Sequence, residues 1–440
     1  MALGRKEPDR QEPLWTATHK IARSEGHPFY RALNRMLARA DFDRWVEALC
    51  EPYYAERTGR PGIPPGVYFR MLFVGYFEGI ESQRGIAWRC ADSLSIREFL
   101  GVPLSENTPD HSTLTRIRQR LPMSVYEKVF AFVLRMADGA GLVEGKTIAV
   151  DSTMLEANAA MKSIVRREGG GDWDAYVRCL MAAEGIEEPT DEDVRRYDRG
   201  RKDKKVSNKD WESPSDPDSR IARMKDGRTH LAYKASHAVD LDTEVIVEAD
   251  VLAADRGDAD SLEGQVEQAE ENLHKAGCAG TVREVVADKG YHKAAVLERV
   301  AERGTRTYIP ERRSRRRRRW KGKPPPRQKA CNANRRRTKG TRGRSLQRRR
   351  SEKVERSFAH TCETGGGRRA TLRGLEPNRK RHKILAAAHN LGRIMREEFG
   401  VGKPRALQGR LGALWKLILS LLLWILGPKS APPRRTAPVA

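Results

Sequence analysis

The sequence has few of the features that mark secreted, disulfide-bonded or membrane proteins. The N-terminus lacks the apolar segment of a signal peptide. The apolar run 411–426 contains Lys416 and is short for a membrane span, so we expect a packing helix there. The six cysteines show no paired CxxC spacing, which argues against a zinc ribbon or a disulfide framework. They are Cys50, Cys90, Cys179, Cys278, Cys331 and Cys362. These absences predict a cytoplasmic protein with no membrane partner.

Acidic residues are nearly missing from one segment. The 440-residue chain carries a formal net charge of +25, and residues 311–350 hold 20 Lys or Arg but one acid, Glu311. Outside this segment the charge is close to balanced. Its low-complexity composition predicts a segment that is unstructured alone and that binds nucleic-acid phosphates, because Arg is the preferred phosphate ligand. The alternative is a run that merely solvates the chain.

The first part of the chain has helical periodicity. Residues 1–24 are polar and are expected to form a flexible tail. Apolar residues then recur at helical spacing over 27–49, 66–80 and 82–102. A shorter helix over 111–121, capped by Thr108 or Asp110 and ended by a proline, suits a helix-turn-helix reader of DNA. Its arginines would touch DNA or lie on a solvated face: Arg116, Arg118 and Arg120.

From residue 146 the pattern changes to strands. Segments rich in Val, Ile and Thr occur at 146–157, 228–240, 244–254, 281–291 and 306–310. Helices are expected at 259–277 and 293–304, and helical pattern returns at 351–362 and 378–399. The order predicts a mixed α/β sheet whose second half is parallel. A charged insertion, 162–228, separates the first two strands and has room for two short helices.

Two aspartates follow apolar strand segments. Asp151 comes directly after Thr147–Val150, and Asp288 after Val285–Ala287. Acids at the ends of buried strands must be paired, protonated or bound to a metal. Two carboxylates from different strands supply the hard oxygen ligands that a divalent cation requires. The alternative is a pair of solvated strand ends.

A second group of acids, Asp258 with its neighbours 255 and 260, follows the third strand segment. We interpret these residues as a loop and a helix N-cap.

A third acid lies on the helix that begins near Arg348. Glu355 stands beside the apolar side of this helix and could reach inward. Glu352, three residues earlier, could pair with arginines or share the same role. Helical glutamates are usually surface residues, so the pattern alone favours no metal role.

A family resemblance joins these features. The segments AVDSTMLEA, HLAYKASHAVD, VVADKGYH and VERSFAHTCETGGGRRATLRGLE, in that order, resemble bacterial insertion-sequence transposases of the DDE type. The stretch from HPFYRALNRML through TPDHSTLTRIRQRLP is similar to their helical N-terminal domain. The resemblance implies an RNase H-like catalytic domain that cuts DNA with two divalent ions, Mg²⁺ or Mn²⁺. It assigns the catalytic and metal-binding roles to Asp151, Asp288 and Glu355.

The resemblance also implies a domain plan and partners. We expect a helical DNA-binding domain over 25–122, an RNase H-like catalytic domain over 123–400 and a C-terminal apolar helix and tail over 401–440. The partners would be double-stranded DNA and a second copy of the chain. Besides the three arginines of the 111–121 helix, the expected DNA contacts are in the basic segment: Arg315, Arg316, Arg317, Arg318, Arg319, Arg335, Arg336 and Arg337.

The chain departs from the family pattern near Glu355. Cys362 stands where related transposases commonly have Lys, and Ser351 where they often have Arg, with Arg350 next to it. Three functions therefore stay open: a transposase for DNA-mediated transposition, a non-catalytic nucleic-acid-binding protein or inactive element copy, and a related metal-dependent nuclease without strand transfer.

Overall fold

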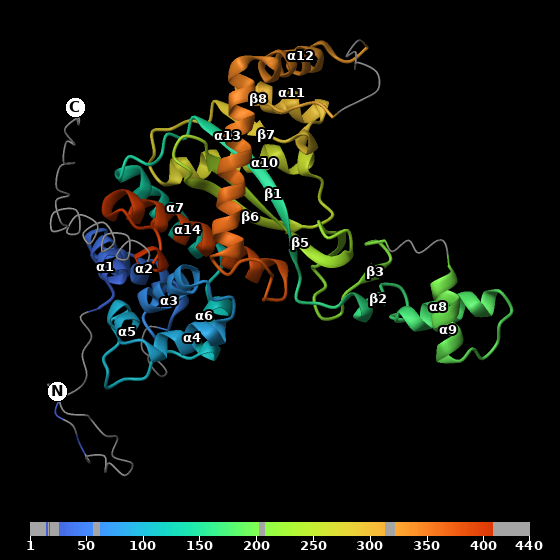
Figure 1. The fold of residues 1–440 in the computed structure, drawn as a ribbon, viewed down its shortest axis with the longest axis horizontal. Helices are drawn as coiled ribbons and strands as arrows, with labels where there is room; N and C mark the ends of the chain where they lie inside the picture. Colours follow the sequence, from blue (N-terminus) through green and yellow to red (C-terminus); the bar gives the residue numbers. More distant parts are fainter. Residues whose placement is uncertain are drawn as a thin grey trace, which may run out of the picture.

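The computed structural model describes residues 15, 17, 26–55, 62–201, 207–312 and 322–407 (Figure 1). The predicted flexible tail lies almost wholly outside these residues. Arg315 to Arg319 and the apolar run 411–426 lie outside them as well. Within the described part, no helix is long and apolar enough to cross a membrane, and the six cysteines are unpaired.

The N-terminal region is helical, as predicted. Asp41, with a left-handed φ of 52°, divides the first helical stretch in two, and Ser93 starts a new helix by accepting a hydrogen bond from the Ile96 amide. Asp110 caps the helix that follows by accepting from the Thr113 amide. The prediction of a single helix over 82–102 is therefore wrong. The elements of this region are α1 (Pro28–Arg39), α2 (Phe42–Cys50), the short turn Glu51–Tyr53, α3 (Pro65–Glu78), α4 (Gln83–Asp92), α5 (Leu94–Leu100) and α6 (His111–Arg120).

A seventh helix, α7 (Met123–Gly139), was not predicted. Nine of its residues are buried, because it packs against the last described helix, α14 (Leu375–Phe399), and touches α10 (Asp258–Lys275). Helix α14 also contacts α3 and the sheet. One continuous hydrophobic core thus joins the N-terminal helices to the α/β region. The predicted boundary between residues 122 and 123 stays a proposal.

The main sheet has the predicted mixed order. Its strands are β1 (Thr147–Glu156), β4 (Arg220–Arg223), β5 (Thr229–Asp240), β6 (Ile246–Ala253), β7 (Glu284–Ala287) and β8 (Arg306–Tyr308). The path runs β4-β5-β1-β7-β8, and β6 also pairs with β5. Strand β5 is antiparallel to β1, whereas β7 and β8 continue in parallel. The parallel half places the ends of β1 and β7 where a site can form.

The predicted insertion, as far as Glu212, forms a small unit that stands beside the sheet in Figure 1, whereas its last part supplies β4 of the main sheet, a strand that was not predicted. It contains the turn Met161–Ser163, the paired strands β2 (Val165–Arg166) and β3 (Trp211–Glu212), and helices α8 (Trp173–Ala183) and α9 (Asp191–Gly200). The two helices pack through a core of their own, built on Val177, Met181 and Val194. The expectation of two short helices was correct.

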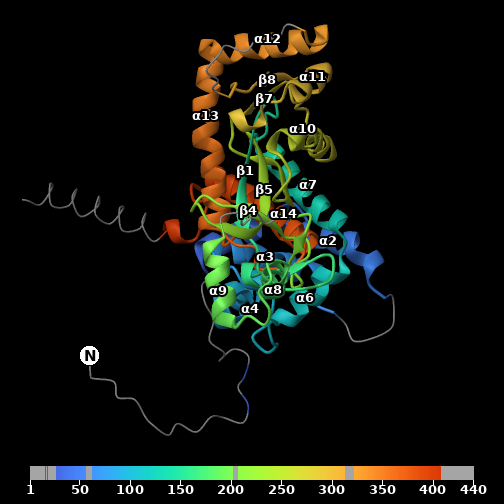
Figure 2. The same cartoon turned by 90° about the vertical axis from the view of Figure 1, so that its right-hand side faces the viewer.

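The basic segment is largely helical, so the prediction of an unstructured segment is wrong for its described part. Helices α11 (Ala294–Glu302) and α12 (Pro325–Lys339) lead into α13 (Thr341–Phe358), which continues as a π-helical turn, Ala359–Glu363. Figures 1 and 2 show α13 standing along the sheet with α12 crossing its end. Buried positions such as Cys331, Asn334 and Leu346 anchor these helices despite their arginine content.

Candidate active site

The site begins with two aspartates on neighbouring strands. Val150 of β1 pairs with Ala287 of β7 in parallel register, and the next residue on each strand is Asp151 or Asp288. The structure therefore brings these two predicted residues together. Asp151 does not end its strand, as we had expected, because β1 continues to Glu156 along β5. Strand β7 does end at Ala287, and the chain turns there through Lys289–Tyr291.

The carboxylate of Asp151 is held by a cation and an amide. Its Oδ2 accepts a hydrogen bond from Arg350 Nη1 at 2.6 Å, and its Oδ1 accepts from the Ser152 amide at 2.8 Å. Burial raises the pKa of Asp151, the Arg350 guanidinium and the Ser152 amide oppose that rise, and the charge of Asp288 adds to it. Because the strands are paired and the charge of Asp288 acts on Asp151, the two carboxylates belong to one site.

Asp288 shapes the turn that follows it. Its Oδ1 accepts a hydrogen bond from the Gly290 amide at 2.7 Å. A Cβ at position 290 would lie 2.8 Å from Asp288 Oδ1 and 3.1 Å from Asp258 Oδ2, so the Asp288 carboxylate would have to shift and that of Asp258 would be crowded. Glycine at this position therefore lets two carboxylates approach the same backbone.

A lysine and a third aspartate complete this side of the site; the sequence analysis missed Lys234 and interpreted Asp258 as part of a loop and helix N-cap. Asp258 Oδ1 accepts from Lys234 Nζ at 2.9 Å and from Ser152 Oγ at 3.1 Å. Lys234 is 5% exposed in the middle of β5. A lysine inside an apolar strand needs a nearby acid, and that was the available signal. The first residue of α10 is thus more than a helix terminus.

Helix α13 is fixed over the strand ends by polar contacts. Gln347 Nε2 donates to the carbonyl of Ala287 at 3.0 Å and to that of Tyr308 at 2.6 Å. His237, which pairs with Asp151 in the β1–β5 register, contacts Ser357 Oγ through Nδ1 at 2.9 Å. Its ring stacks on Phe358 with centroids 4.1 Å apart. These contacts fix the position of α13 on the sheet relative to the two aspartates.

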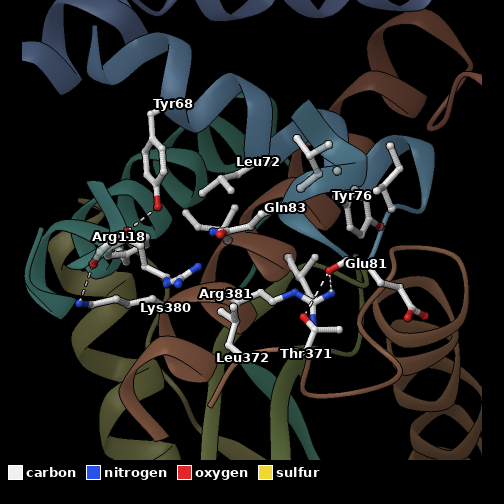
Figure 3. Close-up of a pocket in the computed structure, with 16 residues that line it drawn as sticks. Tyr68, Leu72, Tyr76, Glu81, Gln83, Arg118, Thr371, Leu372, Lys380 and Arg381 are labelled. Carbon is white, nitrogen blue, oxygen red and sulfur yellow. Dashed lines mark hydrogen bonds between the residues drawn. The ribbon is translucent and has the colours of Figure 1, made fainter. Parts of the chain in front are cut away.

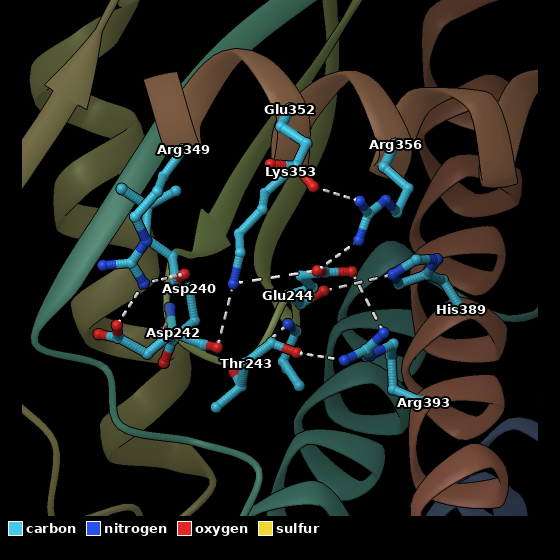
Figure 4. A network of polar contacts seen from close by, with 12 residues as sticks. Asp240, Asp242, Thr243, Glu244, Arg349, Glu352, Lys353, Arg356, His389 and Arg393 are labelled. Atoms are coloured by element: carbon cyan, nitrogen blue, oxygen red, sulfur yellow. Dashed lines mark hydrogen bonds and ion pairs between the residues drawn. The ribbon is translucent and has the colours of Figure 1, made fainter. Parts of the chain in front are cut away.

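The opposite side of α13 is tied to the β5–β6 turn (Figure 4). Glu244, which is 9% exposed and has a left-handed φ of 67°, accepts from Arg356 at 2.7 Å and from Arg393 of α14 at 3.2 Å. Lys353 lies 3.9 Å from the same carboxylate. Glu352 points to this side and pairs with Arg356, which takes it away from Asp151.

Glu355 is not joined to the two aspartates by any contact in the described residues. It is exposed on α13 and accepts a hydrogen bond from Ser351 Oγ at 3.3 Å. Within the parts of the chain that the structure describes, no group of three or more His, Cys, Asp or Glu residues is arranged to hold a metal ion. Arg350, the residue before Ser351, is the arginine that reaches Asp151. Cys362 is buried, and burial raises its pKa.

The predicted DNA contacts divide into outward and inward residues. On α6, Arg116 is exposed and bonded to Ser112, and Arg120 lies over the Tyr54 ring at 4.7 Å. Arg118 instead lines an internal pocket.

The arginines of α12 divide in the same way. Arg336 is exposed. Arg335 is bonded to Glu311 at 2.7 Å, and Arg337 donates to the Thr307 carbonyl at 3.0 Å. Burial lowers the pKa of Arg337.

The mixed sheet and its paired aspartates define an α/β protein of the RNase H-like class. Two family models match the chain: one described as a transposase domain (DUF772) over residues 18–120, and one described as a transposase DDE domain over 203–391. No curated protein and no solved structure matches it. The two matches occur in the expected order and together cover well over half of the sequence. The chain belongs to the insertion-sequence transposases of the DDE type.

Proposed function

We propose that this transposase binds the ends of an insertion sequence and catalyses metal-dependent DNA cleavage and strand transfer. The observation that carries the proposal is that Asp151 and Asp288 directly follow Val150 and Ala287, which pair on two adjacent parallel strands. Phosphodiester cleavage needs an activated attacking oxygen and a stabilised leaving oxygen, and carboxylate-bound divalent ions provide both. Two family-model matches to transposases support the same reading.

The residues present fit a divalent cation in chemistry, because Asp151 and Asp288 offer hard oxygen ligands in one site. We assign metal binding to these two residues and to Glu355, for two Mg²⁺ or Mn²⁺ ions. When bound, such ions supply a Lewis acid and an activated water. The exposed Glu355 would have to turn toward the aspartates, and its bond to the mobile hydroxyl of Ser351 is a weak restraint.

The chain's own residues would prepare the site. Arg350 pairs with Asp151 and opposes the rise in its pKa that burial causes. The Gly290 amide orients Asp288, while Lys234 holds Asp258 beside Ser152. These positioning residues fix where the carboxylates lie relative to one another.

We assign DNA contacts to the outward arginines. Arg116, Arg120 and Arg336 are exposed on α6 and α12. Arg315 to Arg319, together with these, would bind the backbone of double-stranded DNA and make binding strongly salt-dependent. Arg335 and Arg337 instead hold α12 in place. A homodimer on DNA would bring two element ends together.

One observation favours a second candidate, an inactive copy that binds DNA without cutting it. Glu355 lacks contact with the aspartates in the described residues, and Ser351 and Cys362 replace residues common in relatives. A protein of this kind would retain its arginine contacts to phosphate. Cleavage assays separate the two candidates.

The deciding experiment is cleavage of a labelled duplex that carries the sequence flanking the gene, with Mg²⁺ or Mn²⁺. We expect Asp288→Asn to lower the cleavage rate at least about 100-fold, because it removes a charged oxygen ligand. Asp255→Asn, a nearby exposed acid that faces Arg220, is the matched control and should cleave normally. Binding without cleavage by the unaltered chain would favour the inactive copy.

A further inference from the structure

A pocket lies between the N-terminal helices and the start of α14, apart from the two aspartates (Figure 3). It encloses about 40 Å³, room for a few waters or one small ion. Residues from α3, α4, α6 and α7 meet residues of α14 and the 371–372 loop there. Its walls are mainly apolar, with side chains such as Leu72, Ile86 and Ile384, and a few polar groups converge within it. That composition is typical of ligand sites.

Arg118 has no partner for two of its nitrogens. Its Nε and Nη1 are buried and make no hydrogen bond among the described residues. The charge of Arg118 acts on the hydroxyls of Tyr68 and Tyr126, which are 2.7 Å apart, so the guanidinium lies beside this pair. Buried N–H groups without an acceptor are costly, so these two nitrogens call for one.

Two more cations line the same pocket. Arg381 donates to the backbone carbonyls of Arg369, Glu81 and Gly366. Burial lowers the pKa of Arg381 to about 10, and the charge of Arg118 adds to that shift, so the two guanidiniums lie within electrostatic reach. Lys380 donates to the Arg118 carbonyl at 3.2 Å.

The acids nearby do not balance these three charges. Lys380 pairs with Glu376, whose side chain is 60% exposed. Glu81, the one acid among the pocket's lining residues, is exposed; its backbone carbonyl accepts from Arg381, and its charge opposes the fall in the pKa of Arg381. Positive charge therefore exceeds negative charge inside a partly apolar cleft, where electrostatic attraction to an anion is stronger than in water.

We propose that this pocket is a phosphate site, with Arg118 as the central ligand and Arg381 and Lys380 beside it. A tetrahedral phosphate offers several acceptor oxygens, and guanidinium forks match them. Gln83, whose Oε1 accepts from Thr115 at 2.7 Å, presents its amide to the same space. The phosphate group belongs either to a free ion or nucleotide or to a DNA strand. Only the DNA source rests on the proposed function.

The test measures thermal unfolding of the full chain in inorganic phosphate and in chloride at equal ionic strength. We expect phosphate to raise the midpoint, and Arg118→Leu to reduce the rise to the general stabilisation that phosphate gives any folded protein. Arg135→Leu, which removes an exposed arginine from α7, should retain the full rise. No phosphate-specific rise, or an equal rise in Arg118→Leu, would overturn the proposal.

A second measurement covers the case in which Arg118→Leu does not fold. Hydrogen exchange of the unaltered chain should slow in phosphate over residues 111–121 and 371–385, relative to chloride. Equal exchange in both salts across these segments would overturn the site.

DNA titrations then identify the source of the phosphate. If a DNA phosphate fills the pocket, Arg118→Leu lowers DNA affinity and reduces the slope of log affinity against log salt by about one. If a free phosphate is the ligand, DNA affinity is unchanged while the phosphate-specific stabilisation is lost. Either result supports a phosphate site, and neither depends on whether the chain cleaves DNA.

Discussion

Gly290 shows how strongly a single residue conditions the active site. Its amide holds Asp288, and the space that a Cβ would fill is occupied by the carboxylates of Asp288 and Asp258. The geometry of the site therefore depends on the absence of a Cβ at position 290. A change here acts on the geometry of the acids and leaves their chemistry intact.

We expect Gly290→Ala to reduce DNA cleavage about 100-fold, because the new methyl group displaces Asp288 from its position. The matched control is Gly264→Ala, since a Cβ there meets nothing within 4 Å inside α10. That control should cleave normally and be more stable by about 0.5–1 kcal/mol. Cleavage rates and thermal unfolding check both variants. Equal cleavage by Gly290→Ala and the unaltered chain would contradict the expectation.

The sequence analysis predicted the two aspartates of the site but not the pair formed by Lys234 and Asp258. Asp151 and Asp288 were visible because each follows an apolar strand segment. Lys234 and Asp258 belong to different elements, and only the folded sheet brings them to Ser152. The position of Glu355 depends on rotation of a whole helix, which periodicity specifies only coarsely.

Among the elements, the strands were easier to predict than the helices. The Val- and Ile-rich segments at β1, β5, β6, β7 and β8 gave a mixed sheet correctly. Helix α12 and the first half of α13 were missed because their composition is low-complexity and basic. Their arginines are satisfied by partners distant in sequence, such as Glu284 for Arg342 and Glu311 for Arg335, and these partners do not show in a local window.

Helix α13 depends on Glu244 for its placement. We expect Glu244→Gln to destabilise the fold by about 2 kcal/mol, because Arg356, Arg393 and Lys353 then share no carboxylate. That figure is reduced from the value for a fully buried pair, since Arg356 is 40% exposed.

Chemical denaturation measures this effect. Asp242→Asn, which breaks the more exposed pair with Arg349, should cost less than about 1 kcal/mol. If the two variants lost the same stability, Glu244 would not be the anchor.

At the scale of the whole molecule, burial lowers the pKa values of four histidines among the residues that the structure describes. The pKa of His382 and that of His360 fall to about 4, that of His389 to about 3, and that of His237 lies well below its usual value. The unfolded chain therefore binds more protons than the folded chain between about pH 4 and pH 6.5. Stability must fall as the pH drops through that range.

We expect the free energy of unfolding to decrease from pH 7 to pH 5, by up to about 1.4 kcal/mol per pH unit for each imidazole. Urea denaturation at constant ionic strength measures it. His360→Gln removes one titrating group and should flatten the dependence. Stability that stays constant or rises toward pH 5 would show that these imidazoles do not control it.

The shared core has a consequence for synthesis on the ribosome. Asp151 is made early, and its partner Arg350 follows 199 positions later. Helix α14, which packs against both the N-terminal helices and the sheet, emerges after both. At about 5–20 residues per second, the growing chain spends many seconds with its two aspartates present and their supports absent. The order of translation thus delays formation of the active site. A nascent transposase acquires its active-site geometry only when nearly all of the described chain has been made.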